Sequence, residues 1–165
     1  MACSSGVTII ARPNFSSSGR AEARRSTRRW AATKGVHMLD HISIPVSDVE
    51  RAAAFYDTVL ATLGLSRRKE RPGAIGYGPD TSPAPVFWIL DRVREGSASP
   101  GIGLHVSFEA PDRLSVAAFH AAALRCGGKD AGPPGLRPEY TMPFYGAFVF
   151  DLDGFKIEAV CRAPE

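Results

Sequence analysis

The chain has 165 residues, of which 44% are hydrophobic and 22% are charged, an ordinary balance for one globular domain. No apolar run approaches the roughly 20 residues of a membrane-spanning helix, so we expect no membrane partner. The three cysteines are widely spaced and none forms a Cys-x-x-Cys pair, which argues against a thiolate zinc site or a disulfide framework and favours a reducing intracellular compartment.

The net charge of +3 comes from residues 1–37, which hold seven basic residues and one acidic residue. Residues 38–165 hold thirteen basic and sixteen acidic residues, so we expect no nucleic-acid partner for them. The basic segment is rich in Arg and Ser, which predicts a disordered extension. It is typical of a transit peptide, which would make the protein mitochondrial rather than cytoplasmic, or of a start assigned upstream of Met38. A nucleic-acid-binding arm is a third, more distant interpretation.

Residues 39–46 alternate in polarity, which predicts a strand with His41 and Ser43 on one face and the apolar side chains on the other. Ser47 or Asp48 can cap the helix that follows, and Gly64 can end it. Short strands are predicted at 67–71 and 74–78. A longer strand at 83–91 should place Trp88 on the face opposite Phe87.

The second half predicts a strand over 103–109, with His105 and Ser107 on its polar face, and a helix over 112–125. A Pro- and Gly-rich loop is predicted through 132–138. Residues 145–151 and 156–161 are predicted strands joined by a turn at Asp153-Gly154. In the last strand, Glu158 should face away from the core side.

The two halves are copies of one pattern. A shift of 64 positions aligns eight identical residues across positions 41–64, where chance gives about one or two: His41 with His105, Ser43 with Ser107, Asp48 with Asp112, Ala53 with Ala117, Ala54 with Ala118, Phe55 with Phe119, Leu60 with Leu124 and Gly64 with Gly128. This predicts an α+β fold of two tandem βαβββ modules, at about 38–95 and 101–162, which form a cup-shaped mixed sheet with the helices outside.

His41, His105 and Glu158 are predicted to share the groove face of this sheet. An unpaired carboxylate is costly to bury, so Glu158 needs a cation, a metal or hydrogen-bond donors. Two imidazoles and one carboxylate can hold a divalent metal and leave positions open for substrate. Ser43 and Ser107 are candidates for orienting the imidazoles or touching substrate.

Aromatic residues supply candidate walls for the same groove. Trp88, Tyr77 and Tyr140 are predicted to bind substrate, and Tyr145 is a candidate acid or base. His120 lies on the second predicted helix, where packing is the favoured role. The sequence shows no phosphate-binding glycine loop and no serine or cysteine nucleophile motif.

From Met38 to Cys161 the chain resembles the vicinal-oxygen-chelate superfamily of glyoxalases, bleomycin-resistance proteins and extradiol dioxygenases. The segments that carry the resemblance are MLDHISIPVSDVERAAAFYDTVLATLGL, GIGLHVSFEAPD and YGAFVFDLDGFKIEAV. The resemblance implies metal ligands at His41, Trp88, His105 and Glu158, but an indole cannot bind the metal, and this departs from the glyoxalase I pattern. Thr141 and Phe155 stand where related small members often carry histidines.

The resemblance implies a metal-dependent lyase, isomerase or dioxygenase that acts on a small oxygen-rich substrate with Zn, Ni, Mn or Fe(II). Such a metal stabilises an enolate or oxyanion, and Glu158 would move protons. A metal-free binding protein of the bleomycin-resistance type is the alternative, favoured by Trp88. A homodimer is also implied. The site would lie either within one chain or between His41 of one copy and His105 and Glu158 of the other.

Overall fold

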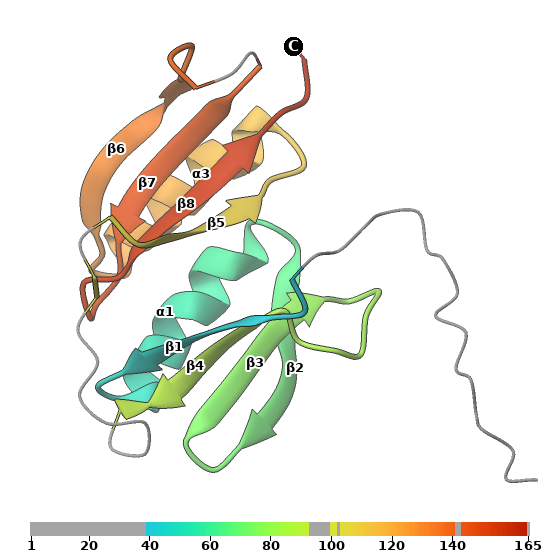
Figure 1. Ribbon diagram of the computed structural model, residues 1–165, viewed down its shortest axis with the longest axis vertical. Coiled ribbons are helices and arrows are strands. Elements are labelled where there is room, and N and C mark those ends of the chain that lie inside the picture. Colours follow the sequence, from blue (N-terminus) through green and yellow to red (C-terminus); the bar gives the residue numbers. More distant parts are fainter. Residues whose placement is uncertain (1–38, 93–99, 102, 141–142, 165) are drawn as a thin grey trace, which may run out of the picture. The chain divides into compact units, whose positions relative to one another are not determined.

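The computed structural model describes residues 39–92, 100–101, 103–140 and 143–164. Each half of this part of the chain forms a βαβββ module (Figure 1). The first module consists of β1 (Ile42–Val46), α1 (Val49–Ala61), β2 (Leu65–Arg71), β3 (Ala74–Pro79) and β4 (Phe87–Asp91). The second consists of β5 (His105–Glu109), α3 (Arg113–Arg125), β6 (Lys129–Leu136), β7 (Tyr145–Phe150) and β8 (Lys156–Cys161). The predictions made for residues 1–37 and for Thr141 lie outside the described residues.

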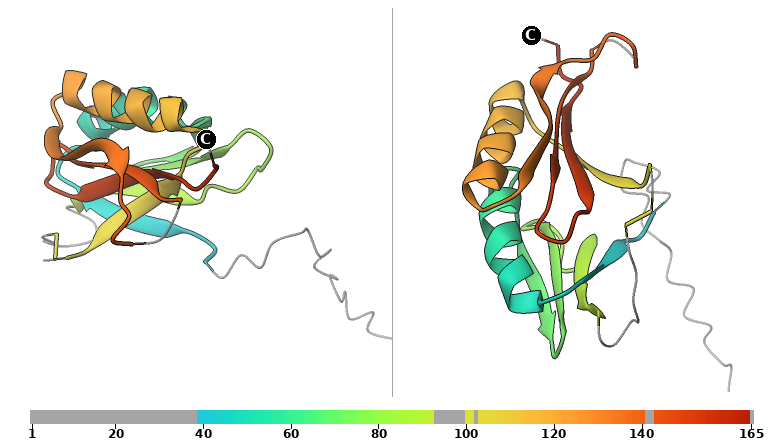
Figure 2. Two further views of the ribbon diagram at one scale, coloured as in Figure 1. Left: turned by 90° about the horizontal axis from the view of Figure 1, so that it is seen from above. Right: turned by 90° about the vertical axis from the view of Figure 1, so that its left-hand side faces the viewer.

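Each module folds into its own four-stranded mixed sheet, called here sheet A (β1–β4) and sheet B (β5–β8). The strand orders are β1-β4-β3-β2 and β5-β8-β7-β6, so the two sheets have the same topology. In each sheet the first and last strands of the module pair in parallel and the other pairs are antiparallel. One helix lies against one face of each sheet (Figure 2). The predicted α+β fold of two βαβββ modules is confirmed.

The helices begin and end where the sequence predicts. Asp48 caps α1 by accepting hydrogen bonds at 3.0 Å from the backbone N–H groups of Glu50 and Arg51. Asp112 caps α3 in the same way, and its hydrogen bonds with Ser115 lower the pKa of its carboxyl. Gly64 follows α1 with a φ of 74°, a left-handed conformation that glycine adopts without strain.

The predicted loop at 132–138 is wrong, because most of it belongs to β6. The pairing of β6 with β7 is irregular between Asp130 and Gly132 and again between Gly132 and Gly135. Prolines 133 and 134 lack the N–H that a central strand needs, but β6 lies at the sheet edge, where proline is tolerated. The predicted strands at 39–46 and 83–91 are shorter in the structure and begin at Ile42 and Phe87.

Buried contacts join the two modules. The rings of Phe87 and Phe108 meet edge to face at 5.2 Å between centroids. The Tyr56 hydroxyl on α1 donates a 2.6 Å hydrogen bond to Oδ2 of Asp151, which lies just after β7. Oδ1 of Asp151 accepts from the backbone N–H groups of Asp153 and Phe155. In the described part of the chain, no helix is long and apolar enough to cross a membrane.

Replacing Tyr56 with Phe should destabilise the fold by about 1–3 kcal/mol, because Asp151 Oδ2 would lose its buried donor. Burial keeps the pKa of the Tyr56 hydroxyl well above its usual value, so this group remains a donor. Urea unfolding at pH 7 measures the effect. Tyr140→Phe is the control, since Tyr140 is exposed, and equal midpoints for the two variants would contradict the prediction.

The loss should also depend on pH. Burial raises the pKa of Asp151, so the folded protein keeps this proton to a higher pH than the unfolded chain does. The stability that this group contributes is therefore present below its unfolded pKa and lost as the pH rises through the folded value. The Tyr56 hydrogen bond opposes the shift, so Tyr56→Phe should cost most at pH 7 and least below about pH 4.

Candidate functional site

Glu158 is a buried carboxylate on the face of sheet B that α3 does not cover. It alternates along β8 with Ile157 and Ala159, which belong to the hydrophobic core. Its side chain is only 3% exposed. Its Oε2 lies 3.2 Å from Nε2 of His105, which is on β5, the strand that pairs in parallel with β8. The structure therefore brings two of the three predicted metal ligands together.

The second carboxylate oxygen has no partner among the described residues. Oε1 of Glu158 is buried and makes no hydrogen bond. Gly146, on the neighbouring β7, leaves room for it: a Cβ there would lie 3.2 Å from Oε1 and 3.0 Å from the Phe144 ring. Leaving a buried oxygen unpaired costs free energy, so this oxygen is suited to contact a cation or a proton supplied from outside the chain.

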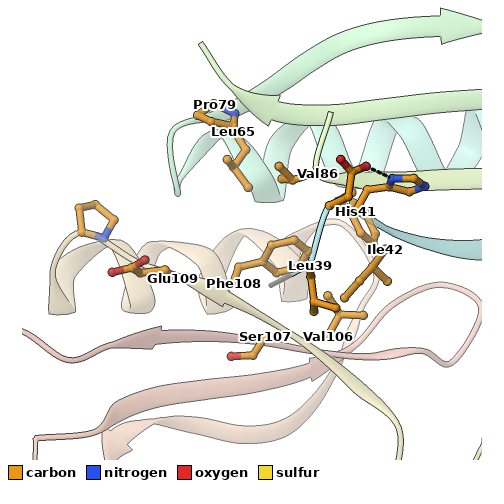
Figure 3. Close-up of a pocket in the computed structure, with 13 residues that line it drawn as sticks. Leu39, His41, Ile42, Leu65, Pro79, Val86, Val106, Ser107, Phe108 and Glu109 are labelled. Atoms are coloured by element: carbon orange, nitrogen blue, oxygen red, sulfur yellow. Dashed lines mark hydrogen bonds and ion pairs between the residues drawn. The ribbon is translucent and has the colours of Figure 1, made fainter. Parts of the chain in front are cut away.

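His41 lies apart from this pair, in a cavity of about 620 Å³ between the start of β1 and β5. Figure 3 shows its imidazole beside this cavity, with Ser107 and Glu109 on the facing strand. Nδ1 of His41 donates to the neighbouring Asp40, and the His41 side chain is 49% exposed. The cavity lining does not include His105 or Glu158.

Within a single chain, the described residues contain no group of three or more His, Cys, Asp or Glu side chains that could hold a metal ion. The predicted triad is therefore present as a pair, His105 with Glu158, and a separate His41.

Trp88 lies on the corresponding uncovered face of sheet A, as its strand parity predicts. It pairs in register with Ser43 on β1 and Gly76 on β3. The indole is 7% exposed, and the Arg71 guanidinium stacks 4.5 Å from its centroid. A Cβ at Gly76 would lie 2.9 Å from the indole and 2.7 Å from Pro85, so only glycine fits at this position of β3.

Two of the four aromatic predictions are wrong about position. Tyr77 is fully buried on the core side, where its hydroxyl donates to Asp57 at 3.1 Å, and burial raises the pKa of that hydroxyl. Tyr145 packs against the core beneath Arg113, so it faces away from Glu158. In both cases strand parity places the side chain on the core face, opposite to the predicted groove face.

The structure also places four further residues that were singled out from the sequence. Tyr140 is exposed and meets the Phe144 ring edge to face at 5.1 Å, at the border of the Glu158 site. Ser107 pairs in register with Glu158. His120 packs on α3 and hydrogen-bonds Asp130, which agrees with the packing role favoured for it. Phe155 belongs to the core.

Three residues that were not among the predicted site residues lie around the same pair. Phe148 pairs in register with Glu158, and its ring lies 6.1 Å from the His105 ring. The Lys156 ammonium lies 4.4 Å and the Arg137 guanidinium 5.8 Å from the centroid of Phe148. Strand parity could have found Phe148, but Arg137 follows a strand that was predicted as a loop.

The model of the Glyoxalase/Bleomycin resistance protein/Dioxygenase superfamily matches residues 38–159. Lactoylglutathione lyase of Salmonella typhimurium is 31% identical over 132 residues, which are 73% of this chain and 89% of the relative. Lactoylglutathione lyase of Neisseria meningitidis is 30% identical over 135 residues, covering 73% of this chain and 87% of the relative.

A solved structure shows the same architecture. The crystal structure of a glyoxalase/bleomycin resistance protein from Albidiferax ferrireducens is 34% identical, with a TM-score of 0.67, and the match covers 76% of this chain and 99% of that one. Glyoxalase I from Zea mays is 23% identical with a TM-score of 0.54 over 74% of this chain and 45% of that one, a likeness of fold.

Proposed function

Because this chain belongs to the glyoxalase/bleomycin resistance protein/dioxygenase superfamily, we propose that it is a metal-dependent lyase acting on a small oxygen-rich substrate. The observation that carries the proposal is the buried Glu158 carboxylate, which has one oxygen beside His105 and the other without a partner. A role in fold stability alone does not account for this pair, because a buried charge that is left partly unsatisfied destabilises a fold.

The donor set fits a divalent metal. An imidazole nitrogen and a carboxylate oxygen are ordinary ligands of Zn, Ni, Mn and Fe(II), and Oε1 of Glu158 retains its full capacity as an acceptor. His105 and Glu158 would hold the ion from sheet B. When bound, a metal would supply Lewis acidity that stabilises an oxyanion or enolate on the substrate.

Residues of the chain would do the rest of the chemistry. Glu158 is the candidate base, because the carboxylate oxygen that does not hold the metal could accept a proton from the carbon beside a substrate carbonyl and return it to a neighbouring position. In the absence of a metal, Nε2 of His105 lies 3.2 Å from Oε2 of Glu158, and this contact orients the carboxylate. Trp88 and Phe148 would provide apolar walls that exclude water from the reacting atoms.

A second copy of the chain would complete the site. His41 is exposed and does not join His105 and Glu158 within one subunit. We therefore assign the third ligand to His41 of a second copy, in a homodimer whose two sites are each built from sheet A of one copy and sheet B of the other. A twofold interface makes both sites at once.

Metal analysis tests the proposal. Protein purified without a histidine tag should contain about one divalent ion per chain, and His105→Ala should lower this content at least tenfold, because loss of a ligand removes most of the affinity. His120→Ala is the matched control, since His120 also lies beside a carboxylate but outside the site. Equal metal content in the His105→Ala and wild-type proteins would end the proposal.

One observation favours a second function. Trp88 lies on the groove face of sheet A where the family resemblance implies a metal ligand, and an apolar ring in place of a ligand suits a site that binds a small molecule without a metal. The protein would then bind and sequester a small molecule without catalysis. Ligand affinity unchanged by a chelator would support this function, whereas turnover abolished by a chelator and restored by metal would support the lyase.

A further inference from the structure

Two basic side chains border the Glu158 site. Arg137 and Lys156 both contact the Phe148 ring. Among the residues that the structure describes, no carboxylate forms an ion pair with either of them. Cations that contact the aromatic neighbour of a buried acid, and have no counter-ion among the described residues, point to an anion supplied by a ligand.

Arg137 is held in place by the backbone of β6. Its Nη2 donates a 2.7 Å hydrogen bond to the carbonyl oxygen of Pro133. The glycines of β6 make room for it, because a Cβ at Gly135 would lie 3.2 Å from Nη1 and one at Gly132 would lie 3.5 Å from Nη2. A guanidinium has five N–H donors, so several are left for a ligand.

Lys156 is the first residue of β8. It pairs with His105 across the β5–β8 ladder and with Phe150 across β7–β8, so its side chain shares the uncovered face with Glu158. Phe148 lies next to Glu158 and forms a buried, 6% exposed apolar floor between the acid and the two cations. The site thus combines a proton acceptor, an apolar surface and two positive groups.

We propose that this face binds a negatively charged group of the substrate, a carboxylate or a phosphate, with Arg137 and Lys156. The inference rests on the proposed function, since it assigns a substrate class to the same site. The substrate is then a small anion whose reacting carbon lies at Glu158 and whose charged end lies over Phe148. Residues 38–165 carry a net charge of −3, so the two cations act as a local site and not as part of a general basic surface.

The experiment measures the affinity of three probes by NMR titration on the full chain treated with a chelator. The probes are phenylacetate, phenyl phosphate and the neutral phenylacetamide. The anionic probes should bind at least tenfold more tightly than the amide. The tighter of the two anions identifies the source of the negative group, and either order supports the proposal.

Arg137→Gln and Lys156→Met should each weaken binding of the tighter anion about tenfold, with little effect on the amide. Arg125→Gln, at the end of α3, is the matched control for loss of one charge and should bind like the wild type. Thermal unfolding checks that each variant folds, and Arg137→Lys serves as a second variant that keeps the charge but removes the fork-shaped donor set.

Anion affinities in Arg137→Gln and Lys156→Met that match Arg125→Gln would overturn the inference, as would equal affinity of the wild type for anion and amide. The metal content of both variants should equal that of the wild type. Lost anion binding with normal metal content supports the anion site and leaves the proposed function standing. If the protein binds the anionic probes more tightly than the amide but never binds metal, the proposed metal-dependent lyase function is contradicted and the anion site is supported.

Discussion

Glu158→Gln should abolish the stabilisation of this protein by divalent metal. A ligand present at a hundred times its Kd stabilises the folded state by about 2.7 kcal/mol, which for a domain of this size raises Tm by about 5–10 °C. The wild type should show this shift with at least one of Zn²⁺, Ni²⁺ and Mn²⁺, and the variant should shift by less than about 2 °C. Differential scanning calorimetry of chelator-treated protein, with each metal added back, makes the measurement.

The same substitution should act differently on the metal-free protein. Glu158 is buried with one oxygen unpaired, so replacing the charge with an amide of equal size removes a desolvation cost. Metal-free Glu158→Gln should therefore unfold at the same temperature as the wild type or higher. A carboxylate that only stabilised the fold through His105 would give the opposite result, a lower Tm without metal.

Asp130→Asn provides the matched control. Asp130 also pairs with a histidine, His120, but it is exposed and lies outside the Glu158 site. The hydrogen bond with His120 is the main cause of the lowered pKa of Asp130. This variant should keep the full metal-induced rise in Tm. A loss of the rise in both variants would show that the metal acts through general charge and not through the Glu158 site.

Mixing two inactive variants should restore metal binding if the site spans two subunits. His41→Ala and His105→Ala homodimers should each bind little metal. Random mixing converts about half of the molecules to heterodimers, in which one of the two sites has all three ligands, so the mixture should recover about a quarter of the wild-type content. Co-expression with two different affinity tags, followed by metal analysis of the purified heterodimer, gives the most direct reading.

A second mixture distinguishes this arrangement from nonspecific recovery. His105 and Glu158 lie together on sheet B, so mixing His105→Ala with Glu158→Gln leaves no heterodimeric site intact and should restore nothing. Recovery in this control, or no recovery with His41→Ala, would contradict a site shared between subunits. The single chain already separates His41 from the pair, and this is the physical reason to expect complementation.

Most of the fold could be predicted because it depends on local periodicity and on the repeat. The alternation of β5 and β8, the caps at Asp48 and Asp112 and the stop at Gly64 are read from neighbouring residues, and all are present. The loop predicted at 132–138 failed for a related reason. Pro and Gly signal a break in isolation, but at the edge of a sheet they are compatible with a bulged strand.

The candidate site was less predictable. Periodicity placed Glu158 on the right face and could not show that one of its oxygens is left unpaired, which depends on Gly146 and Phe144 from other segments. Tyr77 and Tyr145 carry suitable chemistry but point into the core, because their strands place the opposite parity toward the groove. Arg137 could not be predicted as a site residue, because the position of its side chain depends on the path of β6.

The sequence by itself determined the two βαβββ modules, their helix boundaries and the faces on which His105, Trp88 and Glu158 lie, because backbone period and capping are set within a few residues. The tertiary structure decided which of these side chains meet. It joined His105 to Glu158 across parallel strands, left His41 beside a separate cavity, and gathered Arg137 and Lys156 around Phe148. Such contacts depend on sheet register and on the packing of distant segments, which no local pattern specifies.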